Sequence, residues 1–486
     1  MADIKDCQLA GLQGGQRADD DRSLALQFAP MLRMDAREPF LPLAFAYTIF
    51  HEDCDSPSFP RRVQLPSGCS FAIEYAIWWD WDIEHLYELE HIWVYVGPDD
   101  RVIAADASWH GEWRSMRSSD GSLPLLDGRV SPCSEPGKHA FAPDPAILLK
   151  QKSKTGLACG PRAGTSGVHI TPLFAGRIAE RNVINNQLVW TWLERRRFEP
   201  AWNFSQTVDL RDCIAVPWPA LEAWIPERVA HLVAELEASI APAERRVLRI
   251  AHRGASALAQ ENSVAAFRLA AERGADMIEV DLRFTADNVP VAAHDADLQR
   301  VYGVEGNIAD CSLAQLQQLT AGRGEPLLTM EQVVQSCREL MLGLYLDVKD
   351  VDNESAGMAV VELLRQNGML PVTVFGSFRA DWMAELKALC PDAMTSILFA
   401  SRHVDPVALG SSLNANFVHP CWERFDRPQD WLTPDWLAAV RDAGLGVMIW
   451  HEHRPDVIRD LYQLGIYGIC ADDPLDLLPK RLCSPH

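Results

Sequence analysis

The fold of the C-terminal half is decided by residues 277–295, which read MIEVDLRFTADNVPVAAHD. Successive side chains of a strand point to opposite faces, so Glu279 and Asp281 project to one side while Val280 faces an apolar layer. Only twelve residues separate Asp281 from His294, and a parallel crossover with its own helix needs about a dozen residues beyond the strands. We therefore expect a hairpin that turns at residues 286–288. With its centre near position 287.5, Asp281 would lie opposite His294.

From Val247 onward, strand-like runs alternate with amphipathic helical runs, which indicates βα units and a parallel sheet. The nine candidate strands read VLRIA, MIEVDLR, VPVAAHD, LGLYLDV, VTVFGS, TSILFA, ANFVHP, LGVMIW and IYGICAD. VPVAAHD is the return strand of the hairpin. The other eight are the number that a TIM barrel requires, so we predict an α/β TIM barrel.

Polar residues follow several of these strands, and strand ends meet at the C-terminal face of a barrel. His252 follows VLRIA, Glu279 and Asp281 close the second strand, and Asp347 and Lys349 close GLYLDV. Carboxylates side by side repel each other unless a cation lies between them. Oxygen ligands from Glu279, Asp281 and Asp347 suit Mg²⁺ or Ca²⁺ better than zinc, so we predict a divalent cation here. An ordinary strand-end ion pair is the alternative for Asp347 and Lys349.

This inventory is typical of a metal-assisted phosphoester hydrolase. Hydrolysis of a phosphodiester requires charge neutralisation, an activated nucleophile and a protonated leaving group. Arg253, with its planar fork, and Lys349, as a point charge, suit the phosphate oxygens. His252 and His294 then remain as acid and base, since an unperturbed pKa near 6.5 allows proton exchange near neutrality. Which histidine is the acid stays open.

Two further residues have alternative interpretations. Glu261 opens a helical stretch that Asn262 or Ser263 would cap, and it either belongs to that helix start or binds substrate and steadies Arg253. Trp450 ends the run LGVMIW and either forms an aromatic wall of a substrate site or packs in the core.

Two strings resemble the glycerophosphodiester phosphodiesterase family: RIAHRGA and ENSVAAFRLAAERGADMIEVDLRFTADNVPVAAHDADLQR. The resemblance spans roughly the last 240 residues. It implies a TIM barrel that uses a divalent cation to hydrolyse a glycerophosphodiester to glycerol 3-phosphate and an alcohol, with paired histidines at positions 252 and 294. The family usually has Glu where this chain has Asp347, and the shorter arm would shift the ion or admit a water.

Two alternatives to this hydrolase remain. A phospholipase D-type lyase on the same barrel would use an internal hydroxyl to attack phosphorus and release a cyclic phosphate. A binding or scaffold protein would keep the barrel without activity, and Asp347 is the feature that favours it.

Length and composition bound the remaining possibilities. A chain of 486 residues exceeds one ordinary core, so two domains are expected. The formal net charge of -22 argues against a polyanion such as nucleic acid as the main partner. It does not forbid the small phosphodiester substrate, because a local cation and a few arginines can invert the field inside one cleft. No apolar run approaches the roughly 20 residues of a transmembrane helix. The N-terminus does not read as a secretory signal, and twelve scattered cysteines indicate a reducing compartment, so we expect a cytoplasmic protein.

We expect three regions. Residues 1–22 are polar and expected to be disordered. Residues 23–240 are expected to form a β-rich, sandwich-like domain, because runs such as FAIEYAIWW, HIWVYVG and RVIAADASW are broken by turn residues. That domain ends in a helical segment, WPALEAWIPERVAHLVAELEAS. The boundary is predicted at APAERR, with the barrel at residues 246–486.

The N-terminal half has its own candidate metal site. Residues 80–93 read DWDIEHLYELEHIW, and residues 108–111 read SWHG. Carboxylates and imidazoles gathered just before a β-strand could hold a cation, although a solvated acidic loop has a similar composition. The candidate ligands are Asp82, His85, Glu88, Glu90 and His110.

This stretch resembles the metal-bearing stretch of the necrosis-inducing toxin-like family, whose hallmark is an HDWEH run. Tyr87, Glu88 and Leu89 stand where that run has His, Asp and Trp, while Glu90 and His91 retain its last two residues. The tryptophans between 78 and 113 would form a sandwich core, a ligand-binding aromatic surface or a membrane-surface contact. The domain would then be a second enzyme, a substrate-recruiting module or an interaction partner.

Overall fold

The computed structural model describes residues 12, 20–179, 181–350 and 354–478. Contacts between Cα atoms divide the chain into two compact units, Met1–Ser239 and Ile240–His486. Of residues 1–22, which were expected to be disordered, only 12 and 20–22 are described, and residues 20–22 lie in a helix instead. Within the described ranges, none of the helices is both long enough and apolar enough to span a bilayer.

The first unit is built on β-sheets, as its alternating runs predict. Its larger sheet has the order β15-β2-β5-β6-β7-β8, with β13 beside β6. These strands are β2 (Ala44–Phe50), β5 (Phe71–Trp81), β6 (His85–Val96), β7 (Val102–Trp109), β8 (Glu112–Ser115), β13 (Gly167–Val168) and β15 (Ile214–Pro217). A second sheet contains β12 (Phe141–Ala142), β11 (Cys133–Ser134), β1 (Met31–Met34) and β14 (Gln206–Asp209). Trp79 of β5 contacts Phe141 of β12, with ring centroids 6.3 Å apart, so the two sheets touch.

Of the six tryptophans between residues 78 and 113, three are fully buried in the core of the first unit. Trp78, Trp79 and Trp93 are fully buried, whereas Trp113 is 48% exposed and lies against the guanidinium of Arg61. The helices of this unit are α2 (Asp20–Phe28), α3 (Pro145–Leu149), α4 (Lys152–Cys159), α5 (Val183–Glu194) and α6 (Trp218–Ser239). The predicted helical segment is the single helix α6, which continues through Pro226.

The second unit is an eight-stranded parallel barrel with an added antiparallel strand. Its sheet runs β16-β24-β23-β22-β21-β20-β19-β17-β18, and β16 also pairs with β17, which closes the barrel. The strands are β16 (Leu248–Ala251), β17 (Met277–Phe284), β18 (Pro290–Ala292), β19 (Gly343–Val348), β20 (Thr373–Ser377), β21 (Met394–Phe399), β22 (Phe417–Pro420), β23 (Gly446–Ile449) and β24 (Gly468–Ala471). All nine predicted strands of this half are therefore confirmed.

The hairpin between β17 and β18 is confirmed, but its predicted register is wrong. Leu282 pairs with Ala292 and Phe284 with Pro290. The amide of Ala293 donates to the carbonyl of Asp281 at 3.0 Å, so Asp281 faces Ala293 and not His294. The loop is centred on residue 287, because residues 286–288 form a three-residue turn with Asn288 at φ 58°. A loop with an odd number of residues is centred on a residue, whereas the expected centre of 287.5 lies between two residues, so the pairing is shifted by half a residue.

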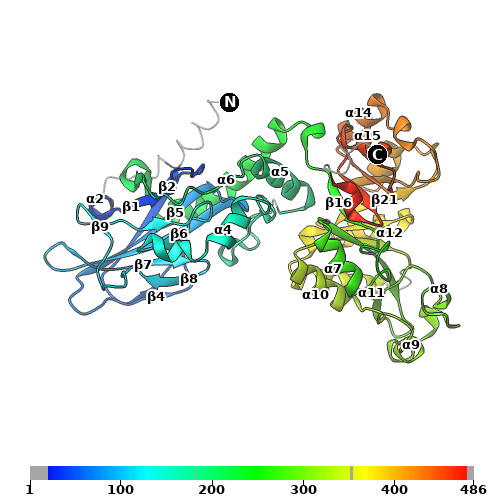
Figure 1. Ribbon diagram of the computed structural model, residues 1–486, viewed down its shortest axis with the longest axis horizontal. Helices are drawn as coiled ribbons and strands as arrows, with labels where there is room; N and C mark the ends of the chain where they lie inside the picture. Colours follow the sequence, from blue (N-terminus) through cyan, green and yellow to red (C-terminus); the bar gives the residue numbers. More distant parts are fainter. Residues whose placement is uncertain (1–11, 13–19, 180, 351–353, 479–486) are drawn as a thin grey trace. The chain divides into compact units, whose positions relative to one another are not determined.

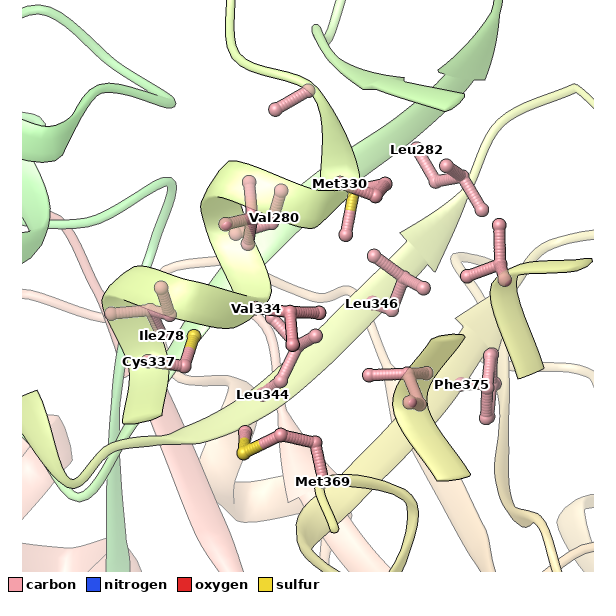
Figure 2. Packing of buried hydrophobic residues seen from close by; sticks show 14 of the residues in the cluster. Ile278, Val280, Leu282, Met330, Val334, Cys337, Leu344, Leu346, Met369 and Phe375 are labelled. Carbon is pink, nitrogen blue, oxygen red and sulfur yellow. The ribbon is translucent and has the colours of Figure 1, made fainter. Parts of the chain in front are cut away.

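Helices cover the outside of the barrel (Figure 1). They are α7 (Val264–Glu272), α8 (Gln299–Tyr302), α9 (Leu313–Thr320), α10 (Met330–Leu340), α11 (Glu354–Gln366), α12 (Ala380–Leu389), α13 (Pro406–Ser412), α14 (Pro434–Asp442) and α15 (Pro455–Tyr462). Figure 2 shows Val334 and Cys337 of α10 packed over Ile278 of β17 and Leu344 of β19. Burying the outward strand residues in this layer directs the alternate residues, Glu279 and Asp281 among them, into the barrel.

Candidate active site

Three carboxylates from two neighbouring strands converge inside the barrel. Glu279 and Asp281 lie on β17 and Asp347 on β19, where Asp281 and Asp347 are register partners. Each offers an oxygen, and these oxygens all lie within 4.8 Å of one another. All three side chains are buried. The structure therefore brings together the three residues that the sequence suggests as cation ligands.

The electrostatics of this carboxylate cluster favour a bound cation. Burial, reinforced by the charges of Asp281 and Asp347, raises the pKa of Glu279 well above its usual range. Burial also raises the pKa of Asp347. Glu279 Oε1 and Asp347 Oδ1 are buried without a hydrogen-bond partner among the described residues. Buried anionic oxygens without donors are the ligands that a hard divalent cation takes, so the donor set fits Mg²⁺ or Ca²⁺.

Two basic side chains border the carboxylate cluster. Lys349 Nζ lies 3.1 Å from Asp281 Oδ1 and also contacts Asp347. Arg253 Nε lies 3.2 Å from Asp281 Oδ2. Although burial opposes the change, these two charges hold the pKa of Asp281 below its usual value. Both predicted phosphate-binding residues thus lie beside the cluster.

The loop after β16 aims Arg253 at the cluster. The backbone amide of Arg253 donates to Glu279 Oε2 at 2.9 Å. Arg253 has φ 55° and Gly254 has φ 82°. A Cβ at Gly254 would lie 2.7 Å from Ala266 Cβ and 2.8 Å from its carbonyl carbon. Only glycine allows both this backbone conformation and the close approach to α7.

Glu261 connects Arg253 to a second arginine. It accepts from Arg253 at 3.2 Å and from two nitrogens of Arg300, each at 2.7 Å. Of the two candidate caps of α7, Ser263 is the N-cap, because its hydroxyl accepts from the Ala266 amide. Asn262 instead donates from Nδ2 to Asp281 Oδ2 at 2.9 Å. Of the roles weighed for Glu261, the geometry favours contact with Arg253.

Each of the two predicted histidines has its Nδ1 beside an aspartate. His252 Nδ1 lies 2.6 Å from Asp472 Oδ1. His294 Nδ1 lies 2.7 Å from Asp295 Oδ1, and Arg300 pairs with the other oxygen of Asp295. Burial lowers the pKa of His252.

Trp450 stands between His252 and Lys349. Its ring centroid is 4.7 Å from that of His252, in a T-shaped arrangement, and 5.8 Å from Lys349 Nζ. Trp450 is half-buried and borders the predicted site residues. This position matches the aromatic-wall interpretation more closely than burial in the core.

The barrel with these residues matches a known family over residues 252–476, that of the Glycerophosphoryl diester phosphodiesterases. The similarity to this family lies in the C-terminal half of the chain. A glycerophosphodiester phosphodiesterase from Caldanaerobacter subterraneus is 25% identical over 242 residues, covering 48% of this chain and 97% of that protein. Glycerophosphodiester phosphodiesterase 1 from Bos taurus is 37% identical over 113 residues, covering 21% of this chain and 34% of that protein.

A solved structure of an Oleispira antarctica phosphodiesterase in complex with the product sn-glycerol-3-phosphate is also similar. The identity is 24% and the TM-score 0.42, and the match covers 47% of this chain and 94% of that chain.

Sequence reasoning missed three residues of this candidate site. Asp472 directly follows β24, so the strand-end argument that identified Asp281 could have identified it. Asn262 was considered only as a helix cap. Arg300 lies on the short helix α8, and nothing in its local sequence indicates its contacts with Glu261 and Asp295.

In the first unit, the structure brings together three of the five candidate metal ligands. Asp82, His85 and Glu88 offer atoms within 4.8 Å of one another. Lys138 Nζ lies 2.8 Å from Asp82 Oδ1, and His169 stacks on His85 at 4.6 Å. The expectation that these residues precede a strand holds for Asp82 but is wrong for His85 and Glu88, because β6 begins at His85.

The other two candidates of the first unit have different partners. Glu90 contacts the hydroxyl of Ser108, and burial together with Glu88 raises its pKa well above its usual range. His110 lies in the turn after β7, with its Nε2 2.8 Å from Glu135 Oε2, so it is not a member of the carboxylate–histidine group. The reason is local, since φ values of 51° at His110 and 82° at Gly111 place this histidine in the turn that joins β7 to β8.

Proposed function

We propose that the C-terminal domain hydrolyses glycerophosphodiesters to glycerol 3-phosphate and an alcohol, with Mg²⁺ or Ca²⁺ as its cation. The observation that carries this proposal is the buried cluster of Glu279, Asp281 and Asp347 beside Arg253 and Lys349, within residues that match the phosphodiesterase family. Glu279, Asp281 and Asp347 would hold the cation. When bound, it supplies positive charge to the phosphate oxygens and lowers the pKa of water.

The protein's own residues would perform the remaining tasks. Arg253 and Lys349 bind the non-bridging oxygens of the phosphodiester, and Glu261 keeps the guanidinium of Arg253 in place. One of His252 and His294 accepts the proton of the attacking water, and the other donates a proton to the departing alcohol oxygen. Trp450 borders the organic part of the substrate.

The direct test is turnover by the purified full chain. After treatment with EDTA, the protein is incubated with sn-glycero-3-phosphocholine with and without added Mg²⁺ or Ca²⁺, and the first product is followed by phosphorus NMR. We expect glycerol 3-phosphate only when a cation is added. A cyclic phosphate as first product would favour the lyase. Absence of turnover with either cation and with several glycerophosphodiesters would favour the scaffold protein.

We also propose that Asp82, His85 and Glu88 form a second cation site in the first unit. Their close approach supports it, as does the buried Asp82 Oδ2, which has no hydrogen-bond partner within the part of the chain that the structure describes. Because the imidazole of His85 suits Zn²⁺ better than Ca²⁺, calorimetric titration of Zn²⁺ into the Glu279→Gln protein, whose barrel site is weakened, tests this proposal. A binding event lost in Glu279→Gln/Glu88→Gln supports the site, and an unchanged titration contradicts it. The resemblance to the toxin-like family and the cytoplasmic location stay predictions.

A further inference from the structure

The pairing of two barrel strands places Asp472 beside His252. Strands β16 and β24 are parallel neighbours, and Ala251 pairs with Ala471. The next residue on each strand is therefore His252 on one and Asp472 on the other. The amide of His252 donates to the carbonyl of Ala471 at 2.9 Å, which holds the two backbones together at this point. The contact between Nδ1 and Oδ1 at 2.6 Å is thus built into the closure of the barrel.

The other ring nitrogen of His252 is left for a ligand. Nε2 is buried and has no hydrogen-bond partner among the residues that the structure describes. A carboxylate accepts and does not donate, so the proton of the neutral imidazole belongs on Nδ1 and the lone pair on Nε2. Because buried polar atoms are normally hydrogen-bonded, we infer that the donor to this nitrogen lone pair comes with the bound substrate.

Asp472 is itself held in place. Ser256 Oγ donates to Asp472 Oδ1 at 3.2 Å. His451 Nε2 lies 3.9 Å from Asp472 Oδ2, and the His451 ring stacks on that of His252 at 4.9 Å. Although burial opposes the change, the hydrogen bond and charge of His252 lower the pKa of Asp472 to about 2. The side chain is therefore a carboxylate at neutral pH.

His252, His451 and Asp472 also form a group that could be taken for a metal site. The 2.6 Å between His252 Nδ1 and Asp472 Oδ1 is the length of a direct hydrogen bond. Two atoms that ligate one ion, each about 2.0–2.2 Å from it, lie about 3 Å or more apart. The geometry therefore favours a proton between these two atoms, not a cation.

We propose that Asp472 is a positioning residue of the phosphodiesterase site. It holds His252 in the Nδ1–H tautomer and fixes the ring so that Nε2 faces the phosphodiester. The inference rests on the proposed function, because it makes Asp472 the residue that orients His252, one of the two imidazoles that transfer protons. His294 has the equivalent partner in Asp295, so both imidazoles of the site are held through Nδ1.

Steady-state kinetics of Asp472→Asn test the consequence for turnover. An amide of the same size can present its N–H to Nδ1 and stabilise the wrong tautomer. We expect kcat on sn-glycero-3-phosphocholine to fall about 100-fold, with KM changed less than threefold, since outer partners of catalytic histidines act on orientation and not on substrate binding.

Asp473→Asn is the matched control. Asp473 is the adjacent carboxylate, pairs with Arg273 at 2.9 Å and caps the turn after β24. This variant should keep kcat within twofold of wild type. Circular dichroism melts of both variants show whether the fold persists. A folded Asp472→Asn protein with wild-type kcat would overturn the inference.

A second measurement does not depend on activity. Nitrogen NMR of the full chain with ¹⁵N-labelled histidine, with the His252 signals assigned from a His252→Gln protein, reports which ring nitrogen carries the proton. We expect Nδ1–H in the wild type and its loss in Asp472→Asn. Nε2–H in the wild type, or an unchanged tautomer in the variant, would overturn the inference. A wild type with this tautomer but no turnover would refute the proposed function and leave the tautomer assignment standing.

Discussion

Asp281 and Asp347 are register partners on adjacent parallel strands, so their carboxylates are held side by side inside the barrel. Glu279 lies two residues before Asp281 on the same face of β17. Lys349 and Arg253 bring two positive charges against three carboxylates. Without a cation, the three buried carboxylates lie close together and repel one another. Burial and the charges of Asp281 and Asp347 raise the pKa of Glu279.

Removing the cation should therefore destabilise the barrel. A ligand that binds only the folded state, present at 100 times its Kd, stabilises by about 2.7 kcal/mol. Urea unfolding in EDTA and in excess Mg²⁺ or Ca²⁺ measures this difference. Identical unfolding curves under the two conditions would contradict a cation site.

Glu279→Gln should separate repulsion from cation binding. The neutral amide removes a buried like charge, so we expect the cation-free protein to unfold at higher urea than wild type. The same change removes a ligand, so the gain in stability on adding the cation should shrink, as should affinity in calorimetry. Glu331→Gln, on the exposed first turn of α10, is the control. It should change neither the gain in stability on adding the cation nor the cation affinity. A cation affinity equal to that of wild type would show that Glu279 is not a ligand.

Alanine substitutions should separate the two histidines proposed to transfer protons from an exposed histidine by their effect on kcat. His252→Ala and His294→Ala should each lower kcat by about 100-fold or more, because general acid and base groups contribute about 10²–10⁴-fold. His403→Ala is the matched control, since His403 is exposed on a loop of the same barrel, after β21. Its kcat should equal that of wild type. Comparable kcat values for all three variants would remove both histidines from the proposed chemistry.

The Arg253 loop can be tested with two glycines. Gly254 and Gly303 both have positive φ, but a Cβ at Gly254 meets Ala266 at 2.7 Å whereas a Cβ at Gly303 meets nothing within 4 Å. Gly303→Ala should lower the free energy of unfolding by only about 1–2 kcal/mol, which is the cost of placing a residue with a Cβ in the left-handed conformation. Gly254→Ala should cost more, and should also displace Arg253 and lower kcat/KM at least tenfold. Urea unfolding and kinetics of the two variants measure this difference, and equal effects would contradict the close approach.

Acid should destabilise the barrel through His419. This residue is buried, with Nδ1 2.7 Å from the hydroxyl of Tyr345, and burial lowers its pKa to about 3. The unfolded chain has a histidine pKa of about 6.5, so between pH 6.5 and 3 the unfolded state binds more protons than the folded state. The free energy of unfolding then falls as pH falls, by up to about 1.4 kcal/mol per pH unit.

The measurement is urea unfolding at several pH values for wild type, His419→Asn and His403→Asn. We expect a shallower slope for His419→Asn below pH 6.5, because the buried titrating group is gone. His403→Asn, at an exposed position of the same barrel, leaves the buried imidazole of His419 in place and should keep the wild-type slope. Parallel slopes for all three proteins would show that His419 does not contribute.

Local patterns were sufficient for much of the barrel. Alternation in MIEVDLR and the shortness of the segment before His294 predicted strand β17, the hairpin and eight parallel strands. The hairpin register was missed because loop conformation depends on single residues, here Asn288 in the left-handed region. The strand ends predicted Glu279, Asp281 and Asp347 as one cluster, since parallel strands that begin on the same side end on the same side.

The sequence by itself determined which elements form and which polar side chains reach the rim of the barrel, because period-two alternation and strand ends are local properties. Only the tertiary structure decided which of those side chains are partners. Asp472 meets His252 across 220 residues of chain because closure of the barrel pairs β16 with β24. No local sequence pattern predicts such a contact, because it depends on the pairing of the last strand of the barrel with the first.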